Sequence, residues 1–234
     1  MTTTSRVAVL GANGRTGRAV VEQALARGWE VLALDERPNG VDRPGVEVRT
    51  GRLDGAEQLD AVVSFGGPIV SALGPASREG GERIGDALEA LLPRIPGRRI
   101  VWVVGAAVPL AEDDRRLFYF LMSRSLARRG DPVLLEKIRE LQLLRYSDAL
   151  WTAVRPPRLG GSTSAGEYRA GDVPLRMYSS ISRGALARFL LDCVEWNWFV
   201  RQSPLVVGRR GSSLRTADEA VVPGPGPSAA PSTG

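Results

Sequence analysis

The sequence predicts a single α/β domain in which a doubly wound, mostly parallel sheet is covered by helices on both faces. Short apolar runs alternate with longer segments of helical periodicity. The apolar runs show little polar alternation, which is typical of strands buried on both faces. With 234 residues and 43% hydrophobic content, the chain is long enough to form one domain with a large core.

The expected elements follow one another in a strand–helix order. The expected strands are 7–10, 31–34, 46–48, 69–73, 100–104, 151–154 and 205–207. The expected helices are 14–27, 81–92, 132–146 and a last helix that Ser182 caps and that runs to Glu195. Residues 1–211 form the expected domain, with lid segments at 109–130 and 157–172, the second a Gly- and Ser-rich loop. Residues 212–234 are so rich in Pro, Gly, Ser and Ala that we expect a disordered tail.

A glycine-rich turn, Gly-Ala-Asn-Gly-Arg-Thr-Gly at 11–17, links the first expected strand to the first helix. Gly11 allows the tight turn, Gly14 lets the backbone approach a pyrophosphate, and Gly17 lets the helix pack closely. The helix N-terminus offers free N–H groups and a favourable dipole to phosphates. Because Asp35 ends the second strand, where an acidic residue is expected, the sequence predicts a Rossmann-type dinucleotide site.

The sequence leaves the choice between NAD and NADP open. Asp35 favours NAD, because its carboxylate can accept hydrogen bonds from the adenosine ribose and repel a 2′-phosphate. Arg15 and Arg37 favour NADP, because both guanidinium groups can reach a 2′-phosphate. Glu36 adds a negative charge beside them.

The composition excludes several kinds of site. The chain has no histidine, which rules out a Ser-His-Asp or Cys-His catalytic arrangement and a His-based metal site. Its one cysteine, Cys193, allows neither an intrachain disulfide nor a multi-cysteine cluster, and we expect a buried core thiol and no metal. The one lysine, Lys137, is expected on a solvated helical face among charged neighbours.

The formal net charge of +5 comes from arginines spread along the chain among acidic residues. A nucleic-acid site needs a clustered basic patch, so we expect no nucleic-acid partner. No apolar run has the length of a membrane span, and no signal-peptide pattern is present, so we expect a cytoplasmic protein without a membrane partner. A monomer or a homodimer is expected.

Four segments carry a resemblance to a known group of proteins. They are the Gly-Ala-Asn-Gly-Arg-Thr-Gly-Arg turn at 11–18, Ser-Ala-Leu-Gly at 71–74, Trp-Thr-Ala-Val-Arg-Pro at 151–156 and Ser-Ile-Ser-Arg at 180–183. With them the chain resembles the atypical short-chain dehydrogenases/reductases, in particular the NmrA-like and flavin/biliverdin-reductase-like NAD(P)-binding proteins. The resemblance covers most of residues 5–210.

The resemblance implies an NAD(P)(H) cofactor that lies across the strand ends, with substrate under residues 109–130 and 157–172. The residues that it places at the cofactor are Asn13, Gly14, Arg15 and Thr16 at the phosphates, Leu53 near adenine, Leu73 and Gly74 near the ribose, and Gly105 and Pro156 near the nicotinamide. The sequence departs from the group at Asp35, where many members carry an arginine just after the strand, and at Arg52, where an acidic residue often follows the glycine.

The better-known branch of this superfamily uses a Tyr-x-x-x-Lys pair and a serine, and the pair is missing here. The nicotinamide carries the hydride chemistry, so the protein need supply little beyond orientation and a proton. Tyr119 is the first candidate for the proton donor, because it lies in an aromatic run expected to cover the pocket. Its alternative role is packing alone, and Tyr168 and Tyr178 are weaker candidates.

Three functions fit these observations. The first is an NAD(P)-dependent oxidoreductase acting on a small-to-medium, fairly hydrophobic organic substrate. The second is a non-redox isomerase, cyclase or dehydratase on the same scaffold, which the missing catalytic pair motivates. The third is a dinucleotide-sensing binding protein that regulates a partner, with the aromatic segment 196–199 as a candidate surface.

Overall fold

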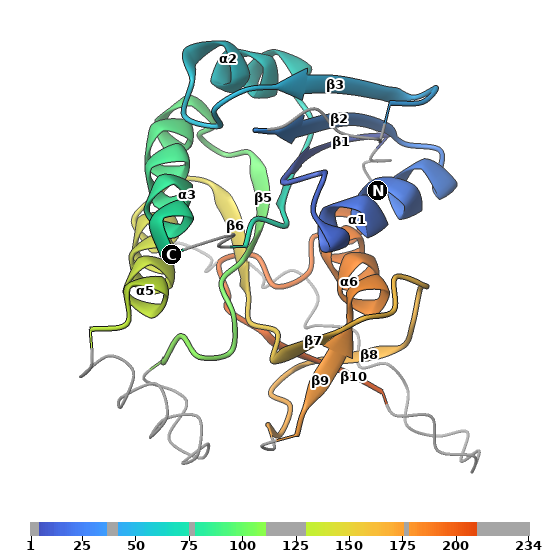
Figure 1. Cartoon of the computed structure of the whole chain (residues 1–234), viewed down its shortest axis with the longest axis vertical. Helices are drawn as coiled ribbons and strands as arrows, with labels where there is room; N and C mark the ends of the chain where they lie inside the picture. The colour runs from blue at the N-terminus through green and yellow to red at the C-terminus, as the bar shows by residue number, and fades with distance from the viewer. Residues whose placement is uncertain (1–4, 37–41, 75–77, 111–129, 176–177, 210–234) are drawn as a thin grey trace, which may run out of the picture.

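The chain folds around a six-stranded parallel sheet with the order β3-β2-β1-β4-β5-β6, which confirms the predicted α/β class (Figure 1). The computed structural model describes residues 5–36, 42–74, 78–110, 130–175 and 178–209. The strands of the sheet are β1 (Arg6–Leu10), β2 (Glu30–Asp35), β3 (Val46–Thr50), β4 (Ile69–Ser71), β5 (Arg99–Val103) and β6 (Leu150–Val154).

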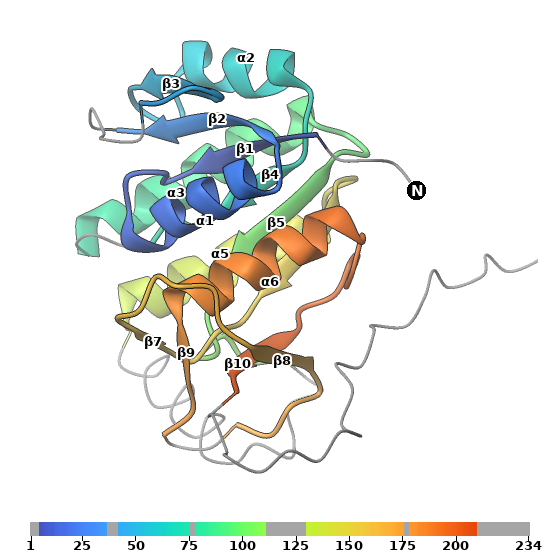
Figure 2. The same ribbon diagram turned by 90° about the vertical axis from the view of Figure 1, so that its right-hand side faces the viewer.

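Helices cover both faces of this sheet (Figure 2). One face carries α1 (Arg15–Ala26) and α6 (Arg183–Glu195), and the other carries α2 (Ala56–Phe65), α3 (Arg78–Leu91), the short 3₁₀ helix η1 (Leu92–Arg94) and α5 (Pro132–Arg145). The predicted cap of α6 is confirmed, because the Ser182 hydroxyl accepts a hydrogen bond from the N–H of Ala185. None of the helices in the described ranges is both long and apolar enough to cross a membrane.

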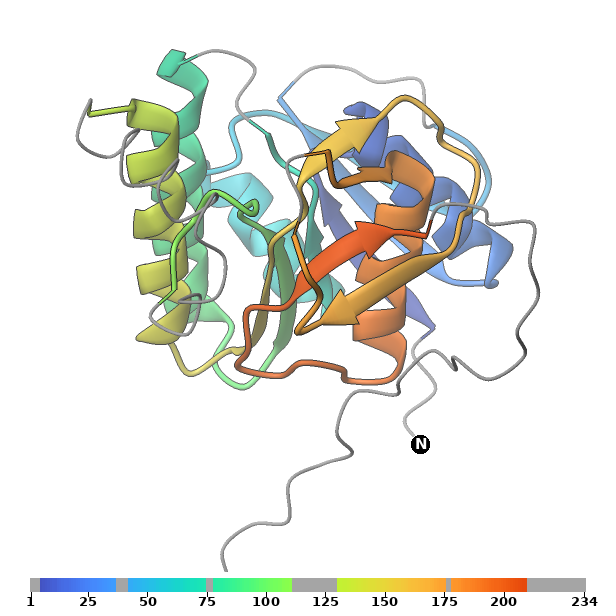
Figure 3. The same ribbon diagram turned by 90° about the horizontal axis from the view of Figure 1, so that it is seen from below.

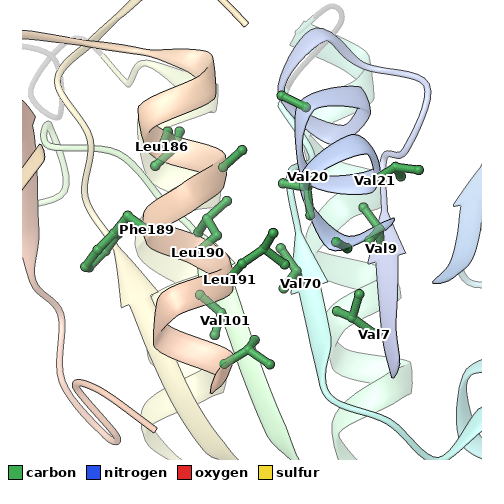
Figure 4. Close-up of a cluster of buried hydrophobic side chains, with 14 of the residues drawn as sticks. Val7, Val9, Val20, Val21, Val70, Val101, Leu186, Phe189, Leu190 and Leu191 are labelled. Carbon is green, nitrogen blue, oxygen red and sulfur yellow. The ribbon is translucent and has the colours of Figure 1, made fainter. Parts of the chain in front are cut away.

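The strands are apolar throughout because alternate side chains enter two separate cores. Val7 and Val9 of β1 pack in the cluster under α1 and α6, whereas Ala8 and Leu10 pack in the cluster under α2, α3 and α5. Figure 4 shows the first cluster, in which leucines of α6 meet valines of α1, β1, β4 and β5. Cys193 is fully buried in it, as predicted, and burial raises the pKa of its thiol.

The chain changes its winding direction at β1. This strand pairs in parallel with β2 on one side and with β4 on the other, so the crossover after β3 passes to the far side of β1. A crevice opens at the carboxyl edge of an open α/β sheet where the winding reverses. The glycine turn follows directly at Gly11.

The structure corrects two expectations. Residues 157–172, expected to be a loop, contain β7 (Arg158–Gly160) and β8 (Tyr168–Gly171), which pair with β9 (Ser180–Ser182) and β10 (Leu205–Gly208). Figure 3 shows β8 and β10 crossing below α6. Strands β7 and β8 each pair with a segment that is distant in the sequence, so no hairpin pattern predicts them. Helix α2, which lies between Gly55 and the pair Gly66-Gly67, was not predicted.

A buried arginine connects the amino end of the sheet to the end of α6. Arg99 begins β5 and is 6% exposed. Its guanidinium donates hydrogen bonds to the carbonyl oxygens of Leu150 (2.7 Å), Cys193 (2.9 Å) and Trp198 (2.8 Å), and to the Thr152 hydroxyl (2.8 Å). Burial lowers the pKa of Arg99 to about 10, so the group remains charged at neutral pH.

These contacts support an unusual backbone segment. Asn197, Phe199 and Arg201 adopt positive φ angles of 51°, 56° and 56°, which non-glycine residues rarely adopt. The Thr152 hydroxyl donates to the Phe199 carbonyl over 2.8 Å, and the Arg201 N–H donates to the Trp151 carbonyl over 2.6 Å. The arginine therefore helps to hold a segment that is costly to form alone.

We predict that Arg99→Met lowers the free energy of unfolding by about 3 kcal/mol or more, because several buried acceptors lose their donor. Urea denaturation of both proteins measures the difference. Arg94→Met, which removes an exposed guanidinium whose one hydrogen bond within the described residues goes to the Ala90 carbonyl, is the matched control and is expected to change stability by less than about 0.5 kcal/mol. Equal stability of the two variants would contradict this role of Arg99.

Candidate functional site

The glycine turn is fastened to the end of β2. The N–H groups of Gly11 and Ala12 donate to the Leu34 carbonyl over 2.9 and 3.2 Å. The N–H of Asn13 donates to the Asp35 carboxylate (Oδ2) over 3.0 Å. Asp35 therefore has a structural task that the sequence did not reveal, because it fixes the turn expected to hold the phosphates.

At two positions of the turn, only glycine fits, because a Cβ atom would clash with its neighbours. Gly11 has a φ of 76°, and a Cβ built there lies 2.9 Å from a methyl carbon of Leu73. A Cβ on Gly17 lies 2.0 Å from the Gly11 carbonyl oxygen and 2.8 Å from the Ala12 Cα. Gly17 thus allows α1 to pack closely, as predicted, against the turn that directly follows β1.

The N-terminus of α1 fits an anion. Gly14 is its N-cap and supplies no side-chain acceptor, and the first turn of the helix contains no acidic residue. Gly14 and Arg15 are both exposed. Free N–H groups, a helix dipole and an adjacent guanidinium suit a phosphate group, so the residues present fit the dinucleotide that the sequence predicts.

The structure brings most of the predicted site residues to one edge of the sheet. Leu73 follows β4 and touches Gly11 of the turn. Gly105 follows β5, with its N–H bonded to the Val154 carbonyl, and the next N–H, of Ala106, donates to the Pro156 carbonyl over 2.8 Å. The ends of β1, β4, β5 and β6 therefore form one continuous border.

The remaining predicted residues fall into two groups. Thr16 is buried in the first turn of α1, Gly74 is exposed after Leu73, and Leu53 lies partly buried in the turn after β3. Arg37 and Tyr119 lie outside the described residues.

Tyr168 does not serve as a free proton donor in this structure. It packs edge-on against Phe189 of α6, and its hydroxyl donates to the Asp192 carboxylate over 2.5 Å. Burial and this hydrogen bond raise the pKa of the Tyr168 hydroxyl. Tyr178, the other weaker candidate, is about half exposed (52%).

The prediction for Lys137 is wrong. Its side chain is 10% exposed rather than solvated. The ammonium forms an ion pair with Glu140, which is fully buried, at 2.8 Å, and it lies 3.4 Å from the carbonyl of Val103, the last residue of β5. The Trp102 indole donates to the same Glu140 oxygen over 2.6 Å. The one feature of the sequence that could have indicated this role of Lys137 is that lysine occurs once in an arginine-rich chain.

Arg155 lies in the segment 151–156, which carries the resemblance, and has a structural role that the sequence did not predict. It is 3% exposed and directly follows β6. Its guanidinium donates to the carbonyl oxygens of Val108 (3.2 Å) and Ser203 (3.0 Å). It thereby ties the loop after Gly105 to the segment before β10 and shapes the border from behind.

A hollow of about 540 Å³ lies elsewhere on the molecule, between η1 and the C-terminal part of α5. It is lined by apolar residues such as Leu92, Pro96 and Leu143 together with Tyr146 and Arg139. Because Pro96 precedes β5 and Tyr146 precedes β6, this hollow lies toward the amino ends of those strands and is separate from the border described above.

Comparison with known families agrees with this geometry. Residues 11–196 match the model of a family described as NAD(P)H-binding. The chain belongs to this NAD(P)H-binding family. The match begins at the glycine turn and ends just after α6, so it includes α1, α6 and all strands of the border except β1. NAD(P)(H) is thus the cofactor of the protein, and the choice between NAD and NADP stays open.

Solved structures share the fold of this NAD(P)H-binding protein. A protein from Lactobacillus casei is 24% identical, with a TM-score of 0.69 over 88% of this chain and all of the other. A proposed NADH-flavin reductase from Streptococcus pneumoniae TIGR4 is 22% identical, with a TM-score of 0.68 over 88% of this chain and 100% of that one. ChuY, an anaerobillin reductase from Escherichia coli O157:H7, is 20% identical, with a TM-score of 0.68 over 91% and 100%.

We predict that Asp35→Ala weakens the binding of NADH and of NADPH by about tenfold, because the Asn13 N–H loses its acceptor and the turn loosens. Asp35→Asn is the matched variant, since its amide oxygen can still accept that bond. It removes only the negative charge, so it is expected to shift the affinity ratio toward NADPH about five- to tenfold. Fluorescence titration measures both. Unchanged affinities in the alanine variant would contradict the structural task of Asp35.

We predict that Lys137→Met lowers the free energy of unfolding by about 3–5 kcal/mol, because the Glu140 carboxylate stays buried without its cation. The double variant Lys137→Met, Glu140→Gln removes that charge while keeping an acceptor for the Trp102 indole, and is expected to regain part of the loss. Urea denaturation compares the three proteins. A single variant as stable as the wild type would show that the pair is not needed.

Proposed function

We propose that the protein is an NAD(P)-dependent reductase that acts on a small-to-medium, fairly hydrophobic organic substrate. The observation that carries the proposal is the border itself, where the open N-terminus of α1 and the backbone around Gly105 and Pro156 lie along one edge. Family membership and the names of structural neighbours, which include an NADH-flavin reductase and an anaerobillin reductase, support it.

The chain's own residues orient the reactants. The nicotinamide, when bound, supplies the hydride chemistry. The N–H groups of Arg15 and Thr16, beside Gly14, would hold the phosphates, and Gly105 and Pro156 would border the nicotinamide. We propose that Tyr119 or water provides the proton, since no Tyr-x-x-x-Lys pair is present.

Lys137 and Glu140 form a buried ion pair behind this end of the border. The ammonium is held between Glu140 and the Val103 carbonyl, two residues before Gly105. Because the carboxylate balances the ammonium, the pair fixes the end of β5 without adding net charge to the border.

The experiment is a titration of the purified protein with NADH and NADPH, followed by a screen of carbonyl, quinone, flavin and ene compounds for loss of reduced-nicotinamide absorbance. We expect saturable micromolar binding of at least one nucleotide and turnover of at least one compound class. Gly17→Ala is expected to abolish binding, because its Cβ meets the Gly11 carbonyl. Binding without any turnover would favour a dinucleotide sensor, and no binding would overturn the proposal.

A further inference from the structure

Two arginines that are far apart in the sequence lie at the beginnings of neighbouring helices. Arg15 is the first residue of α1, and Arg183 is the first residue of α6. The two helices pack side by side in one core, and the Gln23 side chain of α1 donates to the Gly184 carbonyl of α6 over 2.9 Å (Figures 2 and 4). Both helices begin at the carboxyl edge of the sheet, so both arginines belong to the border.

The N-terminus of α6 is itself closed to a ligand. The Ser182 hydroxyl accepts the N–H of Ala185, and the Ser162 carbonyl accepts the N–H of Gly184. The Ser164 carbonyl also lies only 1.9 Å from a Cβ built on Gly184. What α6 offers the border is therefore the Arg183 side chain and not its backbone.

The Arg183 guanidinium is fixed but not neutralised. It donates to the Gly160 carbonyl at the end of β7, which holds it over the junction of β7 and β9. Neither Arg15 nor Arg183 forms an ion pair with any residue of the described ranges. Burial, and then the positive charge of Arg15, lower the pKa of Arg183, so the two guanidinium groups lie near enough to repel each other.

We propose that Arg183 and Arg15 together bind one oxyanion of the ligands at this border, in the first place the diphosphate of the dinucleotide. Two like charges kept close cost free energy that a shared anion removes. Guanidinium groups bind phosphate and carboxylate oxygens in the same planar, bidentate manner. The same two arginines, which together form an anion clamp, would therefore bind an acidic group on the substrate if the diphosphate lies nearer to α1. The inference rests on cofactor binding at the glycine turn.

The test compares wild-type protein with Arg183→Gln, using ADP-ribose as a probe that carries the diphosphate but no nicotinamide. Calorimetric titration is expected to show a loss of affinity of about 10- to 100-fold, and a weaker dependence of the affinity on salt. Arg183→Lys keeps a cation and is expected to restore part of the affinity. Arg188→Gln is the matched control, because Arg188 lies on the same helix, is half exposed and, within the described residues, forms a single ion pair, with Asp192 at 3.7 Å.

A second arm identifies the source of the anion. Succinate is titrated into the complex of protein and reduced nucleotide, and loss of succinate binding in Arg183→Gln with unchanged ADP-ribose affinity would assign the clamp to a substrate acid. If Arg183→Gln binds both probes as the wild type does, the clamp is refuted while the proposed function stands. Wild-type protein that binds neither nucleotide nor ADP-ribose would overturn both.

Discussion

The position of β1 between β2 and β4 is the constraint on which the site depends. Parallel pairing on both sides brings the end of β2 and the end of β4 to the same glycine turn. The turn uses both neighbours, since it donates hydrogen bonds to Leu34 and Asp35 on one side and contacts Leu73 on the other. The turn thereby fixes the direction in which α1 leaves it, so that the N-terminus of α1 faces the crevice.

Buried polar groups in the interior of the molecule hold the strands and loops of the border in place. Arg99 joins the amino ends of β5 and β6 to the end of α6, and Arg155 joins the loop after β5 to the segment before β10. The Lys137–Glu140 pair attaches α5 to the last residues of β5 through Trp102 and Val103. These groups bond to backbone carbonyls or to side chains, which offsets part of the cost of burying charge, whereas the Oε1 atom of Glu140 has no hydrogen-bond partner within the described residues.

The distribution of charge along the border fits an anionic ligand better than a general basic surface. Several arginines elsewhere in the described chain are paired with carboxylates, as Arg27 is with Asp192 and Glu195, at 2.5 and 2.6 Å. Arg15 and Arg183 form no such pair within the described residues and lie at the starts of the two helices that reach the border. The small excess of positive charge can therefore contribute to ligand binding, because two arginines that form no ion pair within the described residues lie at the border.

The sequence by itself determined the alternation of strands and helices, the glycine turn and the burial of Cys193, because each follows from local periodicity or from the geometry of a few adjacent residues. Only the tertiary structure decided the roles of Lys137, Asp35 and Arg183. Asp35 bonds to an N–H of the glycine turn and Arg183 to the end of β7, while Lys137, besides Glu140 of its own helix, bonds to a backbone carbonyl on β5. Local patterns do not encode these contacts between elements. Strands β7 and β8 were missed for the same reason, since each is stabilised by pairing with a segment distant in the chain.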